Sequence, residues 1–165
     1  MNELLQSLIE SLREELQQYG EMLALLDQQQ QHVIQRKTEA LLQNLVAINA
    51  QTSIIQVARR ERERRQGELN QSLQLPAEAT FSQLYPRLPE PYAPLVKALV
   101  DEINQCLRRV KQRAGQNHLL LSKSVEVMQR FMAMLFPSSS VTTYNQTGKA
   151  ATINARRTGL CEVVG

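Results

Sequence analysis

Apolar residues recur at steps of mostly three or four along the N-terminal part of the chain, in two successive stripes. The first stripe consists of Leu5, Leu8, Leu12, Leu16, Tyr19, Leu23, Leu26 and Val33. The second consists of Leu41, Leu45, Ile48, Thr52, Ile55, Leu69 and Leu73. This spacing is typical of amphipathic helices with a coiled-coil seam. It predicts helices over residues 2–35 and 38–74, which bury their stripes against each other.

The turn between these two helices is predicted near residues 35–39. Neither proline nor glycine marks it, so one continuous helix of about 70 residues is the alternative. A hairpin is preferred because two halves of similar length can cover each other's apolar stripes.

Residues 76–93 form a connector of different composition. Five prolines lie in the connector or directly after it: Pro76, Pro86, Pro89, Pro91 and Pro94. This much proline excludes a long helix. Thr80 is a candidate cap for one short helical turn. The aromatic residues Phe81, Tyr85 and Tyr92 are predicted to pin the connector to the end of the helical bundle.

A third helix is predicted over residues 93–136, with proline in its first turn, where it is tolerated. Its stripe consists of Leu99, Ile103, Cys106, Leu107, Val110, Ala114, Asn117, Leu121, Val125, Met128, Phe131, Met132 and Leu135. Asn117 is polar within this stripe, and such an Asn commonly fixes the register of helix pairing. At about 43 residues the third helix is longer than the other two, so its C-terminal part is expected to have fewer neighbours.

These elements predict an all-α fold, an antiparallel three-helix bundle of long coiled-coil-like helices over residues 1–136. After Pro137 the chain turns to Ser, Thr, Asn and Gly with few large apolar residues. Such a segment cannot bury enough surface to order itself. Residues 137–165 are therefore predicted to be a flexible, partner-binding tail.

Composition and charge narrow the function. The chain has 165 residues and a formal net charge of +3, and most of that excess lies in the tail. A nucleic-acid-binding protein usually has a stronger, clustered basic excess. The chain shows neither a signal peptide nor a long apolar span, so direct membrane insertion is not expected and the cytoplasm is the expected compartment.

No constellation of residues points to catalysis. His32, His118 and the two cysteines, Cys106 and Cys161, lack metal-ligand spacing, and no glycine-rich phosphate loop is present. The run Arg59–Arg65 interleaves arginine with glutamate, which favours a solvated helix face over a phosphate-binding one. We therefore expect a protein that is not an enzyme and that needs no cofactor and no metal.

The end of the third helix is rich in methionine and apolar on most sides. Packing in the core is one interpretation of this cluster, and an adaptable protein-binding surface is the other, because methionine repacks to fit varied partners. On the second interpretation, the predicted contact residues are Leu121, Val125, Met128, Phe131, Met132 and Leu135. In the tail, Tyr144 is the single aromatic residue and would suit an anchor for a further partner.

The order of several motifs resembles the FlgN-like family of flagellar type III export chaperones. The likeness is carried by Leu25–Gln30 in the first helix, a polar stretch at the expected turn, the arginine-rich run, and Gln116–Leu120, which looks like the family's Asn-x-x-Leu-Leu. It ends with Thr143–Gly148, similar to the family's Tyr-x-x-x-Gly.

This resemblance implies a cytoplasmic chaperone that binds hook–filament junction proteins, its clients, by a terminal helix. It also implies docking on the cytoplasmic domain of the export-gate membrane protein. Tyr144 and Gly148 match the family's gate-binding motif. Two alternatives remain open at this point: a self-associating coiled-coil adaptor unrelated to secretion, and a nucleic-acid-binding helical protein that uses Arg59–Arg65.

Overall fold

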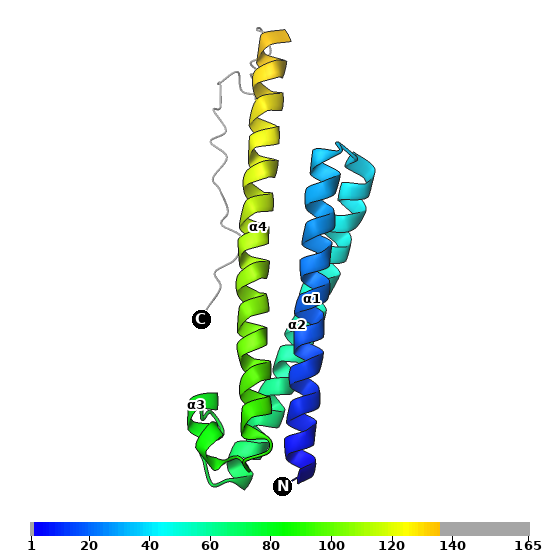
Figure 1. Cartoon of the computed structure of the whole chain (residues 1–165). Helices are drawn as coiled ribbons and strands as arrows, with labels where there is room; N and C mark the ends of the chain where they lie inside the picture. The colour runs from blue at the N-terminus through cyan, green and yellow to red at the C-terminus, as the bar shows by residue number, and fades with distance from the viewer. Residues whose placement is uncertain (1, 136–165) are drawn as a thin grey trace, which may run out of the picture. The chain divides into compact units, whose positions relative to one another are not determined.

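The computed structural model describes residues 2–135. Its elements are α1 (Asn2–Ile34), α2 (Thr38–Ser72), α3 (Phe81–Leu84), the 3₁₀ turn η1 (Tyr85–Arg87) and α4 (Ala93–Leu135) (Figure 1). All regular structure in the described part of the chain is helical, which confirms the all-α prediction. The chain divides into two compact units, residues 1–124 and 125–165, and the boundary falls within α4.

The first turn lies at residues 35–37, inside the predicted range. The backbone N–H of Lys37 donates to the carbonyl of His32 at 3.0 Å, and that of Arg36 donates to Val33 at 3.2 Å. These are the two hydrogen bonds of a Schellman C-cap. Arg36 sits in the left-handed region with φ 56°, where glycine is usual. The helix therefore ends at a well-formed cap that carries no breaker residue.

Helices α1 and α2 pack against each other as an antiparallel hairpin (Figure 1). The side-chain amide of Gln51 donates to the backbone carbonyl of Gln18 at 3.0 Å and to its side-chain oxygen at 2.7 Å. Nearer the turn, Asn44 Nδ2 donates to the carbonyl of Leu25 at 3.0 Å. The interface in this part of the hairpin therefore includes buried polar contacts between the two helices.

The predicted apolar seam of α2 is wrong over this stretch. The residues that α2 buries here are Asn44, Gln51 and Ala58, which are seven positions apart and share one face. Leu45 and Thr52, two members of the predicted stripe, are exposed, and Leu41, Ile48 and Ile55 are half-buried. The predicted stripe reaches the hydrophobic core at Ile55, which is half-buried against it, and at Leu69, which is fully buried.

The main core lies where α1 begins, α2 ends and α4 begins. Its buried members are Leu5, Leu8, Ile9, Leu12, Tyr19, Leu69, Leu84, Leu88, Val96, Leu99 and Ile103. Helix α4 follows α1 in the same direction, because Val96 packs in this core near the start of α1 while Asn117 contacts Leu26 further along. The core thus gathers the apolar residues of three helices and the connector at one end of the first unit.

The connector is held to this core by side chains. Asn70, fully buried, donates through Nδ2 to the carbonyls of Ala77 and Ala79 at 3.0 and 2.9 Å. The backbone N–H of Thr80 donates to Gln83 Oε1 at 3.0 Å in a capping box that starts α3. The predicted packing of the connector's aromatic residues is confirmed, since the core is flanked by Phe81, Tyr85 and Tyr92.

Candidate protein-binding site

The apolar stripe of α4 changes from buried to exposed along its length. Val96, Leu99 and Ile103 are buried, and the stripe is buried again at Asn117, which is 1% exposed. At Leu121 it is half-buried. From Val125 onward every stripe residue is at least 49% exposed. The helix has 43 residues, against 33 in α1 and 35 in α2, in line with the predicted difference in length.

Polar contacts hold α4 to α1 just before this change. Asn117 Nδ2 donates to the carbonyl of Leu26 at 2.7 Å and to Gln29 Oε1 at 2.9 Å. One turn earlier, Arg113 Nε pairs with Asp27 Oδ1 at 2.7 Å. Because Asn117 bonds the Leu26 carbonyl and the Gln29 side chain together, this pair of hydrogen bonds forms at one register of α4 on α1. This geometry supports the register role suggested by its place in the stripe.

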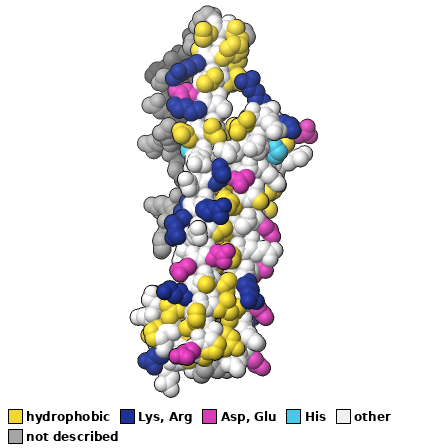
Figure 2. All heavy atoms as spheres, viewed as in Figure 1, with side chains coloured by type: hydrophobic (Ala, Val, Ile, Leu, Met, Phe, Trp, Pro, Cys, Tyr) yellow, Lys and Arg dark blue, Asp and Glu magenta, His cyan; other side chains and the backbone are white. Residues whose placement is uncertain are grey.

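The second unit contains the described segment 125–135, which is helical throughout. Its predicted contact residues are all exposed: Val125 by 55%, Met128 by 61%, Phe131 by 55%, Met132 by 49% and Leu135 by 55%. Steps of three and four place them on one side of the helix. In Figure 2, hydrophobic side chains gather at this end of α4. The remaining predicted residue, Leu121, belongs to the first unit.

Two further apolar residues of this segment are exposed and border the stripe, because they lie four positions before and three positions after Phe131. Val127 is 65% and Met134 is 81% exposed. The prediction omitted them because they fall outside the stripe. On the side away from this apolar face, Glu126 and Arg130 form an ion pair at 2.7 Å across one helical turn. The apolar face of the segment is therefore wider than the predicted stripe, and a charged pair lies on the opposite side.

The arginine-rich end of α2 forms mostly internal ion pairs. Glu61 accepts from Arg64 at 2.6 Å and from Arg65 at 2.7 Å. These hydrogen bonds lower the pKa of Glu61 to about 2. Arg59 pairs with Glu63 at 3.0 Å. The glutamates thus offset part of the local positive charge and engage most of its arginines, which supports the solvated-face interpretation over a phosphate-binding one.

One arginine of this run turns inward instead. Arg62 Nε donates to Glu15 Oε2 on α1 at 2.8 Å, and the Glu15 side chain is 3% exposed. The guanidinium also lies 5.9 Å from the centre of the Phe81 ring. Arg62 therefore ties α1, α2 and the connector together. Sequence reasoning missed this contact, and the only available signal was a glutamate at a position next to the seam of the first helix.

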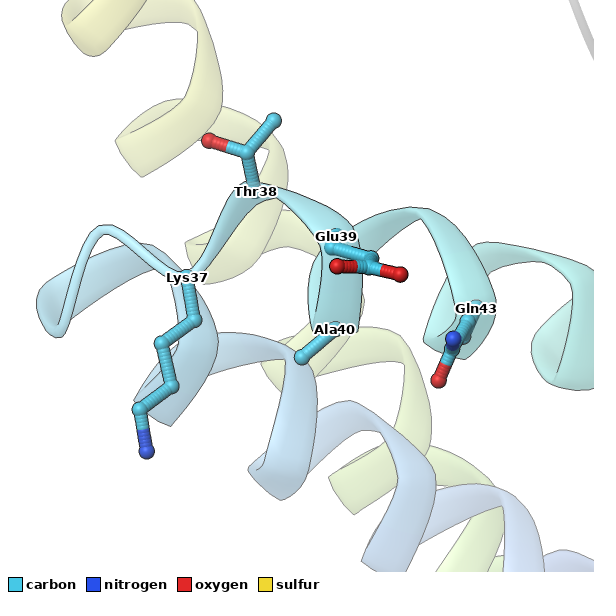
Figure 3. Close-up of a pocket in the computed structure, with 5 residues that line it drawn as sticks. All are labelled: Lys37, Thr38, Glu39, Ala40 and Gln43. Carbon is cyan, nitrogen blue, oxygen red and sulfur yellow. The ribbon is translucent and has the colours of Figure 1, made fainter.

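Among residues 2–135, no group of three or more His, Cys, Asp or Glu could hold a metal ion. Burial raises the pKa of the Cys106 thiol, which makes it a poor nucleophile near neutral pH. A hollow of about 420 Å³ lies at the first turn of α2, lined by Lys37, Thr38, Glu39, Ala40 and Gln43 (Figure 3).

None of the helices described is long and apolar enough to span a membrane. The two residues expected to contact the export gate, Tyr144 and Gly148, lie outside the described residues.

The fold and the site define an all-helical protein with coiled-coil-like helices and an exposed apolar helix face. The chain belongs to the FlgN family, since the family model described as FlgN protein matches residues 1–152. The resemblance noted in the sequence is thereby confirmed. The family is one of chaperones and suggests a role in flagellar export. No significant match was found among curated proteins or among solved structures.

Proposed function

We propose that this protein is a cytoplasmic chaperone that binds hook–filament junction proteins and delivers them to the flagellar type III export gate. Membership of the FlgN family supports the chaperone role. The observation that carries the proposal is the exposed stripe of Val125, Met128, Phe131, Met132 and Leu135 on α4. An uncovered helix face of this kind can supply the helix–helix contacts that a client helix lacks before assembly.

The size of this surface suits reversible binding. Fully burying a large apolar side chain is worth about 1.5–3 kcal/mol. These five side chains are about half-exposed, so a client can still bury about half of each. Covering them would therefore yield about 5 kcal/mol or more, part of which the cost of association offsets. Methionine at two of the five positions lets the face adapt to more than one client helix. A chaperone must release its client for export, so moderate affinity fits the role.

The rest of the chain has a supporting role in this proposal. The shared core and the contacts of Asn117 and Gln51 support an antiparallel three-helix bundle, in which α4 is the third helix. The tail, with Tyr144 and Gly148, would engage the cytoplasmic domain of the export-gate membrane protein. Client and gate would then be bound by different parts of one chain, so that both can be held at once.

The test is binding of a purified junction protein to a stripe variant. The double variant Met128→Asp with Met132→Asp should lower client affinity by about 100-fold, because two carboxylates would be buried without partners. The helical circular dichroism and the melting temperature should stay unchanged, since both side chains are exposed in the free chaperone.

The matched control is Arg130→Gln with Ala133→Asp, which makes the same change in net charge at exposed positions on the side of the helix away from the stripe. This variant should bind the client within about threefold of the native protein. Normal binding by the folded stripe variant would refute the client surface. Equal loss in both variants would show that charge on α4, and not the stripe, is what matters.

A further inference from the structure

The first half of α2 is unusual for a helix with solvent on one side. From Ala40 to Ala58 it carries no charged residue. Its most buried side chains in this stretch, Asn44, Gln51 and Ala58, face α1. The other sides hold more apolar surface than the hairpin covers. A helix that is apolar on several sides is normally buried on several sides.

An apolar stripe runs along the outer face of this segment. Leu42, Val46, Ile54 and Val57 are 59%, 70%, 47% and 63% exposed, and Ala50 between them is exposed as well. Steps of four, four, four and three keep these five residues on one side of the helix. That side is turned away from the residues that face α1. The stripe is about 22 Å long, at 1.5 Å per residue.

The spacing of apolar residues along the stripe is nearly the same on both sides of Ala50. Val46 and Ile54 lie four positions before and after it, and Leu42 and Val57 lie at similar distances further out. Beyond each apolar end stands a charge of opposite sign, Glu39 before and Arg60 after. Helical spacing places both charges on the side that carries the stripe.

These two charges have no ion pair within residues 2–135, although Arg60 is surrounded by arginines that do. In Figure 3 the carboxylate of Glu39 and the amine of Lys37 point away from one another. The hollow beside Glu39 is open to solvent on the same turn. Each end of the stripe thus presents an exposed charge that a partner can reach.

We propose that the outer face of α2 binds the same face of a second copy of this chain, with the two α2 helices antiparallel across a two-fold axis at Ala50. Leu42 would then pack on Val57 of the second copy, and Val46 on Ile54. Glu39 would pair with Arg60 of the second copy at both ends. The small side chain of Ala50 lets the helices approach closely at their crossing.

Self-complementarity is what selects a second copy over another partner. In a two-fold interface, if one residue contacts a second residue of the other copy, the second residue also contacts the first across the axis. The order of residues along an antiparallel helix pair must therefore be complementary to the same order read backwards. This stripe meets that condition in apolar residues and in terminal charges. A client helix would require no such symmetry. The inference concerns a different face from the proposed client surface, and it does not depend on the chaperone role.

The first test is the mass of the full-length protein in solution, measured by light scattering after size exclusion at about 100 μM, a concentration chosen to populate micromolar dimers. The expected mass is about twice the 18.8 kDa of one chain. Ala50→Glu places two carboxylates against each other at the axis and should return the monomer. Thr52→Glu adds the same charge at an exposed position on another side of α2 and should leave the dimer intact. Circular dichroism checks that both variants remain helical.

The second test examines the antiparallel register. Glu39→Arg or Arg60→Glu alone should weaken dimerisation about tenfold, since each replaces both terminal ion pairs with like-charge contacts. The two substitutions together should restore the native dissociation constant within about threefold. Failure of the double variant to recover would overturn this register. A monomeric native protein, or a dimer unaffected by Ala50→Glu, would overturn the proposal. If the native protein is already monomeric and Ala50→Glu loses client binding, the face belongs to the client instead.

Discussion

The side chain of Asn117 on α4 donates a 2.7 Å hydrogen bond to the backbone carbonyl of Leu26 on α1, at a site where Asn117 is 1% exposed. The same amide nitrogen, Nδ2, also donates a hydrogen bond to Gln29 Oε1 at 2.9 Å. Its own Oδ1 is buried and has no hydrogen-bond partner. The residue therefore gives the helix pair a defined register while leaving one buried acceptor unsatisfied, which limits its contribution to stability.

The substitution Asn117→Ala removes both hydrogen bonds and leaves a cavity. We expect the free energy of unfolding to fall by about 2 kcal/mol, measured by urea denaturation followed by circular dichroism. Asn117→Leu serves as the contrast, since it fills the space and removes the unsatisfied oxygen. Its unfolding free energy should stay within about 1 kcal/mol of the native value. A loss as large as that of the alanine variant would show that the hydrogen bonds themselves dominate.

The ion pair between Glu15 and Arg62 gives a second prediction. Arg62→Ala leaves the buried carboxylate of Glu15 without its partner and should lower the free energy of unfolding by about 3–5 kcal/mol. Replacing both residues, as Glu15→Leu with Arg62→Met, removes the charges together and should recover most of that loss. Thermal and urea melts of the two variants make the comparison. Equal destabilisation in both would mean that the contact of Arg62 with Phe81, not the charge pair, matters most.

The pKa of Glu61 provides a pH-dependent test. The folded protein holds this pKa at about 2, below the ordinary value of 4.5, through hydrogen bonds from Arg64 and Arg65. A lowered folded pKa contributes stability that is present above the unfolded pKa and is lost as the pH falls through the folded one. The contribution should therefore disappear between about pH 4.5 and 2.

Carbon-detected NMR titration of the Glu61 carboxyl measures this directly. Arg64→Gln with Arg65→Gln should return the pKa towards 4.5. High salt should raise it in the native protein as well, because the Glu61 side chain is 44% exposed and salt screens its ion pairs. A titration near 4.5 in the native protein at low salt would contradict the ion-pair arrangement.

The tail prediction separates gate binding from client binding. If residues 137–165 are flexible, Tyr144→Ala should leave the melting temperature nearly unchanged. An interface tyrosine anchor is worth roughly 2 kcal/mol or more, so affinity for the export-gate domain should fall about thirtyfold. Client binding should be retained, and secretion of the client should be poorer. Thr143→Ala, its neighbour, is the matched control.

Two other results would count against this division. A Tyr144→Ala variant that binds the gate normally would remove the residue from the gate contact. A variant that loses thermal stability and both binding activities together would mean that the tyrosine packs back on the helices.

Much of the helical framework followed from residue pattern. Steps of three and four predicted three long helices, and the prolines between residues 76 and 94 marked the connector because they cannot continue a helix. The exposed end of α4 was also predicted from the pattern, because a helix of 43 residues exceeds partners of 33 and 35. The turn had no marker, since Arg36 takes a conformation that usually belongs to glycine.

Which side of α2 faces α1 was decided only by the tertiary structure. Periodicity identifies a buried face by contrast with a charged one, and residues 40–58 supply no charged face for contrast. The pattern therefore predicts the stripe through Leu45 and Thr52, although Asn44 and Gln51 are the residues that face inward. They do so because their amides reach the backbone carbonyls of Leu25 and Gln18. Those acceptors come into range only when two helices distant in sequence lie side by side, so local pattern contains no record of them.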